Sequence, residues 1–224
     1  MRFLDHNRRS PGRGIVLAGW WDIAETFCEI TLRLLFQVRV QGSDRVPRHG
    51  AVMFVSNHQS YLDPIVNGIA TKDRQVGYLA RHSLFRGPFG KLIASVGAIP
   101  LKEHSDMAAI RAAIQELKAG RCITVYPEGG RSEDGAVGAF QRGVALILRR
   151  THVPVVPMAV RGTFAAWPSS RMVPRFFQKL SVTVGEPISA AVLLGDSDDG
   201  VSRLRNAVVT LHGTMGRHMD TSHG

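Results

Sequence analysis

Two residues in this sequence, His58 and Asp63, have the types and the spacing that a proton-transfer reaction requires. His58 follows the apolar run 51–55, which predicts a buried strand, and Asp63 precedes the apolar segment 65–70, which predicts a helix. A histidine titrates near neutral pH and can remove a proton from an alcohol. A carboxylate within reach fixes the histidine tautomer and stabilises the imidazolium that forms. The pair therefore predicts a general base, His58, oriented by Asp63, on a loop between a strand and a helix.

Each of these residues also has a simpler structural interpretation. A histidine in a loop is often no more than a loop residue, and Asp63 followed by Pro64 is a typical helix start with Asp63 as the N-cap. The spacing of the pair is not sufficient to choose between the two interpretations. A second motif bears on the choice.

The second motif, residues 126–132, reads Tyr-Pro-Glu-Gly-Gly-Arg-Ser and follows another strand-like run about seventy residues further along the chain. Gly129 and Gly130 let the backbone approach a ligand closely. Arg131 presents a planar fork of donors that suits a phosphate group. These residue types favour a phosphorylated ligand.

The two motifs together, Asn-His-x4-Asp at residues 57–63 and Tyr-Pro-Glu-Gly-x-Arg-Ser at residues 126–132, resemble those of the glycerolipid acyltransferase family. Its best-known members are the 1-acylglycerol-3-phosphate (lysophosphatidate) acyltransferases. The resemblance implies transfer of a fatty acyl group from a thioester, acyl-CoA or acyl carrier protein, to the free hydroxyl of lysophosphatidate or a related lysolipid, in phospholipid biosynthesis. It covers roughly residues 38–188 and includes weaker matches at residues 97–101, 153–162 and 182–188.

The resemblance also implies roles for individual residues. His58 takes the proton of the acceptor hydroxyl with Asp63 behind it, so the alkoxide attacks the thioester directly, and neither an acyl-enzyme nor a metal or other cofactor is expected. Arg81 stands where the family usually has a phosphate-binding lysine, although a solvated surface arginine is an equal interpretation. The expected substrate-binding residues are Arg81, Glu128, Gly129, Gly130 and Arg131.

Two positions depart from the family's pattern. The second conserved block of the family usually ends in an arginine, where this chain has Glu103, preceded by Lys102. A carboxylate cannot bind phosphate as an arginine does, so either Lys102 replaces it or Arg81 and Arg131 suffice. Gln141 also stands in place of a lysine. These departures leave open an acceptor other than lysophosphatidate within the same family.

The alternation of strand-like apolar runs with helical segments predicts an α/β fold, with a mixed, largely parallel sheet flanked by helices and the site at the strand ends, and the length suits a single domain. The chain has 224 residues, of which 44% are hydrophobic. We expect a basic segment and an amphipathic helix at residues 1–36, an acyltransferase α/β domain at residues 37–190, and a helical segment of the same domain at residues 191–224. The two cysteines, Cys28 and Cys122, predict neither a disulfide framework nor a metal site, and they indicate a reducing compartment.

The N-terminal segment predicts an amphipathic helix of about twenty residues. Four charged residues between Asp22 and Arg33 line one face, and Trp20, Phe27 and Leu34 mark another. Such a helix either packs on the core or lies in a membrane interface, and the tryptophans with a basic flank favour the interface. No uninterrupted apolar run reaches about twenty residues, so neither a transmembrane span nor a cleavable signal peptide is expected. We expect peripheral or monotopic attachment to the cytoplasmic face of the cell membrane.

The formal net charge of +10 indicates an anionic partner, such as nucleic acid, a membrane surface or a phosphorylated substrate. Residues 161–179 carry four positive charges, no negative ones and four aromatic side chains. This composition is typical of a single-stranded nucleic-acid site, of a segment at an anionic bilayer, or of a loop with core aromatics. The catalytic pair favours the membrane, and no nucleic-acid partner is expected.

Other classes of protein remain as alternatives. A serine hydrolase that uses Ser60 or Ser132 is disfavoured because the sequence has no Gly-x-Ser-x-Gly elbow, and a nucleotide enzyme is disfavoured because it has neither a P-loop nor a Gly-x-Gly-x-x-Gly motif. A non-catalytic basic protein that binds a membrane or nucleic acid would explain the positive charge but would not explain the presence of His58 and Asp63. The acyltransferase is therefore the favoured hypothesis.

Overall fold

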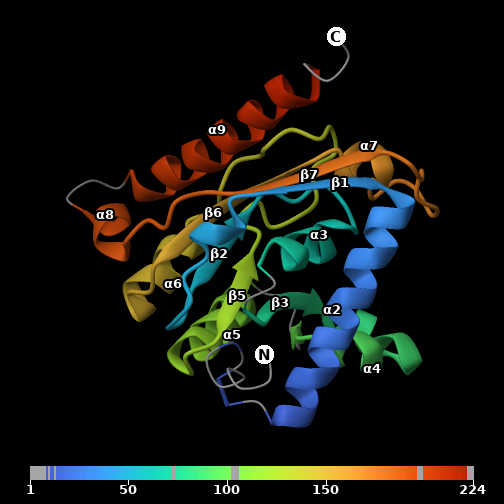
Figure 1. Cartoon of the computed structure of the whole chain (residues 1–224). Coiled ribbons are helices and arrows are strands. Elements are labelled where there is room, and N and C mark those ends of the chain that lie inside the picture. The colour runs from blue at the N-terminus through green and yellow to red at the C-terminus, as the bar shows by residue number, and fades with distance from the viewer. Residues whose placement is uncertain are drawn as a thin grey trace.

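Seven strands form one continuous sheet in the part of the chain that this computed structural model describes, which is residues 9, 11–12, 14–71, 74–101, 106–195 and 199–220. Helices lie on both sides of the sheet (Figure 1). In spatial order the strands are β1 (Gln37–Gln41), β7 (Lys179–Val184), β6 (Val155–Arg161), β2 (Met53–Ser56), β5 (Cys122–Val125), β3 (Val76–Arg81) and β4 (Ala98–Leu101).

Most neighbouring strands run parallel to each other. β2 pairs in parallel with both β5 and β6, and β3 pairs in parallel with both β5 and β4. β7 is antiparallel to β6 and parallel to β1. The predicted mixed, largely parallel sheet is therefore confirmed. The carboxyl ends of the five mutually parallel strands meet at one edge, which is where ligands bind in open α/β sheets.

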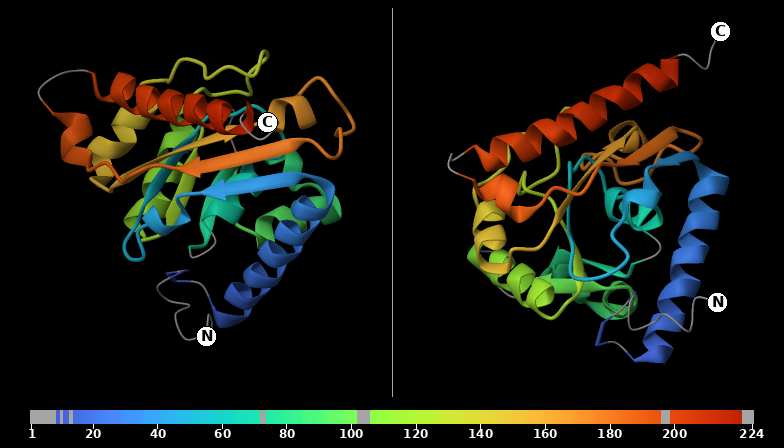
Figure 2. Two further views of the ribbon diagram at one scale, coloured as in Figure 1. Left: turned by 45° about the horizontal axis from the view of Figure 1, so that its top comes forward. Right: turned by 60° about the vertical axis from the view of Figure 1, so that its left-hand side comes forward.

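The central strands are buried because helices pack on both faces of the sheet. All of β2 is enclosed, and its side chains alternate between two apolar clusters, with Phe54 in one and Met53 and Val55 in the other. The Phe54 side is covered by α2 (Ile15–Leu35), α3 (Asp63–Ala70) and α7 (Thr163–Ala166). The opposite side is covered by α5 (Asp106–Lys118), α6 (Gly143–Thr151), α8 (Ala190–Leu194) and α9 (Gly200–Asp220) (Figure 2). The remaining helical elements are η2 (Ser43–Arg45), η3 (His82–Phe85) and α4 (Gly87–Ser95).

α2 is the predicted amphipathic helix, and its 21 residues confirm the expected length. It meets the domain through Trp21 and Leu32, which are buried, and through Asp22, whose carboxylate pairs with Arg9 at 2.7 Å. Most of its large apolar side chains point outward instead. Exposed positions spaced alternately three and four residues apart form what we call the α2 stripe: Val16, Trp20, Ile23, Phe27, Ile30 and Leu34.

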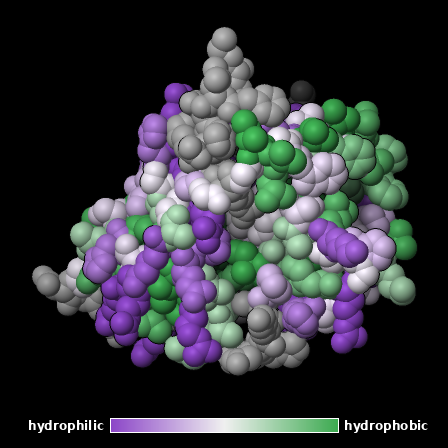
Figure 3. Space-filling model, turned by 90° about the horizontal axis from the view of Figure 1, so that it is seen from below, coloured by the Kyte–Doolittle hydropathy of each residue, from purple (hydrophilic) through white to green (hydrophobic). Residues whose placement is uncertain are grey.

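The α2 stripe is part of a wider apolar surface. Seen from below, apolar side chains gather on the side of the molecule that carries α2 and α4 (Figure 3). On that side Leu92 of α4 and Leu84 of η3 are also exposed. Among the helices that the structure describes, none is long and apolar enough to span a bilayer. Glu103, at which the sequence departs from the family's second block, and the preceding Lys102 both lie outside the described residues.

Candidate active site

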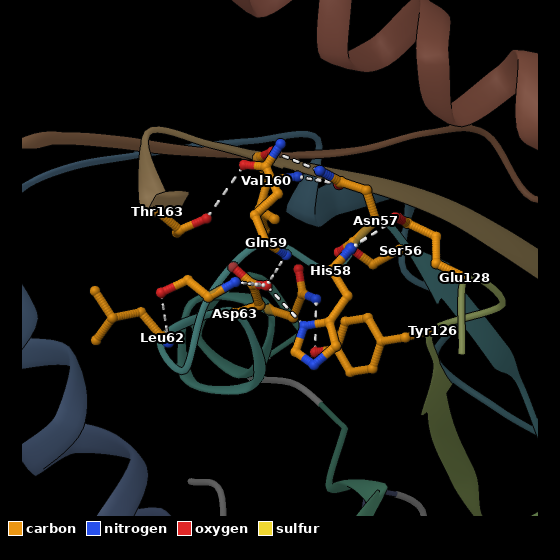
Figure 4. Close-up of polar contacts among 12 residues, drawn as sticks. Ser56, Asn57, His58, Gln59, Leu62, Asp63, Tyr126, Glu128, Val160 and Thr163 are labelled. Carbon is orange, nitrogen blue, oxygen red and sulfur yellow. Dashed lines mark hydrogen bonds and ion pairs between the residues drawn. The ribbon is translucent and has the colours of Figure 1, made fainter. Parts of the chain in front are cut away.

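The candidate site lies at the carboxyl end of β2, on the loop that joins this strand to α3. Although it is a loop, Asn57, Gln59 and Ser60 are each exposed by 2% or less. Asn57 connects the loop to the neighbouring strand β6, because its side-chain nitrogen donates to the Val160 carbonyl at 3.0 Å and its side-chain oxygen accepts from the Val160 amide at 2.8 Å (Figure 4). The Asn57 side chain thereby makes the backbone hydrogen bonds to β6 that a residue of a neighbouring strand would make, and it fixes the start of the loop.

Asp63 is fully buried, and its Oδ2 atom accepts three hydrogen bonds. The donors are His58 Nδ1 at 2.8 Å and the backbone amides of Gln59 at 2.5 Å and Ser60 at 2.7 Å. Because two amides already donate to this oxygen, it is an acceptor, so Nδ1 carries the proton and the lone pair lies on Nε2. The interpretation of Asp63 as a helix N-cap is wrong: α3 begins at Asp63 itself, its N-cap is Leu62, and the carboxylate holds the preceding loop instead.

The imidazole of His58 stacks on the ring of Tyr126, the first residue of the second motif. The ring centroids are 4.2 Å apart and the planes are inclined by 22°. The Tyr126 hydroxyl accepts a hydrogen bond from Asn67 Nδ2 at 3.2 Å, and Asn67 lies one helical turn after Asp63 on the same face of α3. Tyr126 is partly exposed, yet burial around its hydroxyl, and then the charge of Asp63, raise its pKa well above the ordinary value. A neutral tyrosine therefore fixes the plane of the imidazole.

Glu128 ties the two motifs together. Its Oε1 accepts from the backbone amide of His58 at 2.9 Å, and its Oε2 accepts from the amide of Gly138 at 3.2 Å. A further bond of 2.7 Å joins the Ser132 amide to the His58 carbonyl. Burial raises the pKa of Glu128, while the hydrogen bonds from His58 and Gly138 act in the opposite direction. Both oxygens thus hold loops together, and the expected contact of Glu128 with a substrate stays a prediction.

The two glycines of the second motif differ in what their backbone requires. Gly129 has a φ of 76°, in the left-handed region, and a Cβ at this position would lie 2.2 Å from Gln141 Nε2. The Gly129 amide donates to the Tyr126 carbonyl at 3.1 Å and closes a tight turn. Gly130 has open space where a Cβ would stand. Gly129 is therefore needed to shape the loop, whereas the approach of a ligand to either glycine stays a prediction.

Arg131, in the loop after β5, contacts the loop after β2, with its guanidinium carbon 3.8 Å from the centre of the Tyr61 ring. Tyr61 in turn contacts Trp167, with ring centroids 5.3 Å apart, and the Ser60 hydroxyl donates to the Trp167 carbonyl at 2.6 Å. Arg81 is exposed at the end of β3, on the same edge of the sheet, but β5 separates its strand from β2. The structure thus brings Arg131 to the loop that carries His58 and Asp63 and leaves Arg81 further along the edge.

The C-terminal helix α9 supports both loops. His212 Nε2 lies 3.3 Å from Gln59 Nε2, beside the catalytic pair. Arg205 donates to the carbonyls of Gly138 at 2.7 Å and Val137 at 2.9 Å, in the loop that follows the second motif. The helical segment that follows residue 190 therefore helps, through α9, to hold the loops of the site in place.

Sequence reasoning missed the residues that hold the catalytic pair in place. One of them had a local signal, because Asn67 lies four residues after Asp63 on a predicted helix, where side chains share a face. Asn57 and Tyr126 stand in the two sequence motifs without an assigned role, because their contacts with Val160 and with the His58 ring form only when distant segments pack. Tyr61 and Trp167 meet the site through the same packing, for which a single sequence carries no signal.

Comparison with known proteins places this geometry in a family. The sequence pattern of the family described as Acyltransferase matches residues 37–161, more than half of the 224-residue chain. A chloroplast 1-acyl-sn-glycerol-3-phosphate acyltransferase of Brassica napus is 29% identical over 152 residues, which cover 66% of this chain and 44% of that protein. A 1-acyl-sn-glycerol-3-phosphate acyltransferase of Bacillus subtilis is 25% identical over 171 residues, which cover 74% of this chain and 82% of that protein. The match thus spans less than half the length of the plant relative.

A solved structure agrees with these matches. The crystal structure of the 1-acyl-sn-glycerophosphate acyltransferase PlsC from Thermotoga maritima superposes with a TM-score of 0.73 at 27% sequence identity, covering 91% of this chain and 83% of that one. Both sequence motifs fall inside the residues that the family pattern matches. By the extent of that match, this chain belongs to the Acyltransferase family.

Proposed function

We propose that this protein transfers a fatty acyl group from a thioester donor, acyl-CoA or acyl carrier protein, to the free hydroxyl of 1-acylglycerol-3-phosphate. The observation that carries the proposal is the 2.8 Å hydrogen bond between His58 Nδ1 and the buried Asp63, which leaves Nε2 as a base. The relatives from Brassica napus, Bacillus subtilis and Thermotoga maritima are named for acyl transfer to this class of acceptor.

The proposed reaction needs one proton shuttle. His58 Nε2 removes the proton of the acceptor hydroxyl while the oxygen attacks the carbonyl carbon of the thioester. The tetrahedral intermediate carries its negative charge on the former carbonyl oxygen and collapses when the carbon–sulfur bond breaks. The imidazolium then returns its proton to the departing thiolate, which leaves as a thiol. Asp63 stabilises the imidazolium between the two transfers. The thioester is already activated, so the scheme uses no acyl-enzyme, metal or cofactor.

We assign the acceptor phosphate to Arg131. The Tyr61 ring covers one face of the guanidinium, and this contact leaves the N–H groups at its edge available as donors to phosphate oxygens. Arg81, at the same edge of the sheet, supplies a second positive charge to the approaching acceptor. Glu128, Gly129 and the neighbouring Gly130 complete the proposed binding loop.

A mostly apolar cavity beneath α2 supports a substrate with an alkyl chain. It lies between α2, α3 and β3, and Pro64, the residue after Asp63, is one of its walls. Apolar pockets with few polar groups are typical sites for hydrophobic ligands. Because one of its walls is the residue that follows Asp63, we assign an alkyl chain of the substrate to this cavity. Its apolar walls include Trp21, Pro64, Ile65, Ile69, Val76 and Val96.

A lipid acceptor places the enzyme at a membrane. We assign the exposed α2 stripe to the interfacial region of the cytoplasmic leaflet, with peripheral or monotopic attachment. The net charge of +10 suits anionic headgroups. The partners of the proposed enzyme are thus the lysophospholipid acceptor, the thioester donor and the membrane surface, and nucleic acid is not among them.

A purified-protein assay tests the proposal. Labelled acyl-CoA and acyl carrier protein are each incubated with lysophosphatidate, with lysophosphatidylcholine and with glycerol 3-phosphate. We expect the fastest transfer to lysophosphatidate, and we expect His58→Ala to lower turnover by about 10²–10⁴-fold, the usual contribution of a positioned base. Arg131→Ala should raise the KM for lysophosphatidate and leave the KM for the thioester unchanged, while Arg131→Lys shows how much of the effect is charge alone.

The outcomes of this assay separate the alternatives. A folded His58→Ala variant that keeps more than half of the wild-type turnover would refute the mechanism. Faster transfer to an uncharged headgroup would assign a non-phosphatidate acceptor within the same family. No transfer with any acceptor or donor would favour a non-catalytic membrane- or nucleic-acid-binding protein.

A further inference from the structure

Large apolar side chains are exposed on the loop between α7 and β7. We call residues 171–178 of this segment the apolar loop. Met172 is exposed by 94%, Phe177 by 73% and Val173 by 63%, and Phe176 by 43%. Soluble monomers rarely leave a contiguous group of such side chains in water, so a group of this kind marks an interaction surface.

The apolar loop is held in this outward conformation by specific contacts. The Phe177 amide donates to the Leu35 carbonyl at 2.7 Å, and the Arg175 amide donates to the Ala166 carbonyl at 2.7 Å. Phe177 has a φ of 59°, in the left-handed region, which is an unfavourable conformation for a bulky residue. A strained residue of this kind persists where the surrounding structure imposes it, and such residues concentrate at functional sites. The fold therefore presents the Phe177 ring to the outside.

The charges around the apolar loop select the partner. Arg171 and Arg175 are exposed within it, and Lys179 follows it. The chain has no aspartate or glutamate from residue 161 to residue 185. This segment has apolar side chains flanked in sequence only by cations. In an anionic bilayer the apolar side chains would contact the hydrocarbon region, and the cations would contact the negative headgroups above it.

The apolar loop also continues the surface of the α2 stripe. It lies beside the C-terminal end of α2, where the Phe177 amide is bonded to Leu35 and the rings of Phe36 and Phe176 are 6.0 Å apart (Figure 2). Leu34, the last residue of the stripe, is 72% exposed at this end. One continuous surface that combines a helix and a projecting loop suits a bilayer.

A short chain of contacts leads from the apolar loop to the site. The Arg171 carbonyl accepts a hydrogen bond from Trp167 Nε1 at 3.1 Å. Trp167 contacts Tyr61, with ring centroids 5.3 Å apart, and Tyr61 carries the guanidinium of Arg131 at 3.8 Å. The position of the apolar loop relative to the bilayer therefore fixes the height of Arg131 above it.

We propose that the apolar loop inserts into the acyl region of an anionic bilayer beside the α2 stripe, and that this insertion holds Arg131 at the level of the lipid headgroups. The second clause rests on the proposed function, because it concerns the phosphate of a lipid acceptor. The first clause concerns only where four side chains lie relative to the lipid, and it is tested without any turnover.

A fluorescent label tests the insertion directly. Met172→Cys is introduced in a Cys28→Ser background and labelled with a polarity-sensitive dye, and Val192→Cys on α8, a 56% exposed apolar position, gives the matched control. The full chain is mixed with phosphatidylcholine vesicles, with vesicles that also contain phosphatidylglycerol, and with a single-stranded oligonucleotide. We expect a blue shift from position 172 on anionic vesicles and none from position 192. A label at 172 that stays in water while the protein floats with these vesicles, or responds only to the oligonucleotide, overturns the proposal.

Substitutions in the apolar loop test its consequence for the enzyme. We combine Met172→Ser, Val173→Ser and Phe177→Asn, because asparagine tolerates the left-handed backbone, and compare them with Val192→Ser/Val209→Ser on α8 and α9. Flotation with anionic vesicles, and turnover of vesicle-bound lysophosphatidate, should fall by at least about fivefold in the loop variant and stay unchanged in the control. Turnover of a short-chain, water-soluble acceptor should stay within about twofold in both.

The same experiments separate failure of this proposal from failure of the proposed function. A loop variant that floats and turns over lipid as the control does would overturn the insertion, whatever the acceptor. A shift from the labelled Met172→Cys protein, together with a wild-type protein that transfers no acyl group to either acceptor, would overturn the proposed function and retain the insertion.

Discussion

Asp63 accepts three hydrogen bonds on one buried oxygen. The geometry of the site therefore depends more on Asp63 than on His58. Its second oxygen, Oδ1, is buried without a hydrogen-bond partner among the described residues. A buried charged oxygen that lacks a partner is costly, because it has lost its hydration without replacement. A positive imidazolium at His58 offsets part of that cost. In the proposed reaction, such an imidazolium forms beside Asp63 each time His58 takes a proton.

Asp63→Asn tests this role at the scale of one residue. The substitution keeps the shape of the side chain but removes its charge, and an amide nitrogen turned toward Gln59 or Ser60 would oppose their N–H groups. We expect kcat to fall by about 10²–10⁴-fold while the protein stays folded. The measurement is steady-state kinetics with a thermal melt as control. Near-wild-type turnover would leave Asp63 as a residue that only shapes the loop.

Tyr126 gives a second prediction, because its ring and its hydroxyl do different things. Tyr126→Phe removes the bond from Asn67 but keeps the stack on His58, so we expect kcat within about threefold of wild type. Tyr126→Leu removes the stack, and the imidazole then samples other planes. We expect kcat to fall by about ten- to a hundredfold with little change in either KM, since misplacement by about 1 Å costs up to that much. Equal rates for the two variants would show that the stack does not position His58.

The candidate reactive residues could be predicted from the sequence, but the contacts that hold their side chains in place could not. His58, Asp63 and Arg131 have side chains whose reactivity is fixed by type, and the first two share one loop. The stack on Tyr126 depends on β5 lying next to β2, and the contact of Arg131 with Tyr61 depends on the path of a second loop. Such contacts arise only when the strands are in register.

At the scale of elements, Glu128 joins the loop after β2 to the loop after β5, and this link predicts a pH dependence. Burial raises the pKa of Glu128 above its ordinary value of 4.5, so the folded state binds this proton more tightly than the unfolded state does. The resulting stabilisation is fully present below that ordinary value and is lost as the pH rises through the folded-state pKa. Relative to Glu128→Gln, the free energy of unfolding of the wild type should therefore fall as the pH rises from acid toward neutral.

Denaturant unfolding at several pH values measures this difference. The Glu128→Gln variant keeps one oxygen as an acceptor for the His58 amide, so it serves as the reference without a titrating group. A difference between the two proteins that does not change with pH would show that the environment of Glu128 does not shift its protonation on folding.

The α2 stripe carries a prediction about membrane attachment. Deleting residues 1–33 would also remove Trp21, which fills the space beside Gly97, so a deletion confounds anchoring with folding. Ile23→Ser, Phe27→Ser and Ile30→Ser together alter only the exposed stripe. We expect flotation with vesicles to fall by at least about tenfold, because complete burial of one large apolar side chain contributes about 1.5–3 kcal/mol of binding free energy. The melting temperature should stay close to that of wild type. Unchanged flotation would exclude α2 as the anchor.

The length and amphipathic pattern of α2 could be predicted, and its tryptophans and basic flank favoured an outward apolar face, but the pattern alone did not decide between that and packing on the core. A surface helix ordinarily turns its apolar side to the core. Here the domain meets α2 through Trp21 and through the Arg9–Asp22 ion pair, so the inner face is partly polar and the stripe is left outside. Only the docked position of the helix on α3 and β1 decides which face is covered.

At the scale of the whole molecule, the net charge of +10 predicts that attachment depends on salt as well as on apolar contact. Ionic screening shortens the reach of surface charges from about 10 Å at 0.1 M to about 3 Å at 1 M salt. We expect binding to phosphatidylglycerol vesicles to weaken markedly over that range and the residual binding to neutral vesicles to change little. Flotation at the two salt concentrations measures it. Equal binding to both vesicle types at both salt concentrations would exclude an electrostatic contribution to membrane attachment.

The class of fold followed from the alternation of apolar runs and amphipathic segments, and the details of the sheet did not. The runs that became β2, β5 and β6 are mostly apolar because both of their faces are covered, which indicates a parallel sheet. The reversal of β7, and its pairing with β1, depend on contacts such as Val38 opposite Leu180. No local pattern records a partner so far away in the chain.

That pairing sets an order of events while the chain is being made. β1 emerges from the ribosome with α2 already complete, but its partner β7 follows about 140 residues later. At about 5–20 residues per second, the wait is roughly 7–28 seconds. For most of this wait the α2 stripe is available to a nearby membrane while the site is incomplete, because β5, the Gly129 turn and β6 are made during the wait and β7 only at its end. On the proposed attachment, the nascent chain meets a bilayer before its site is complete, and attachment becomes a step in biosynthesis instead of a later recruitment.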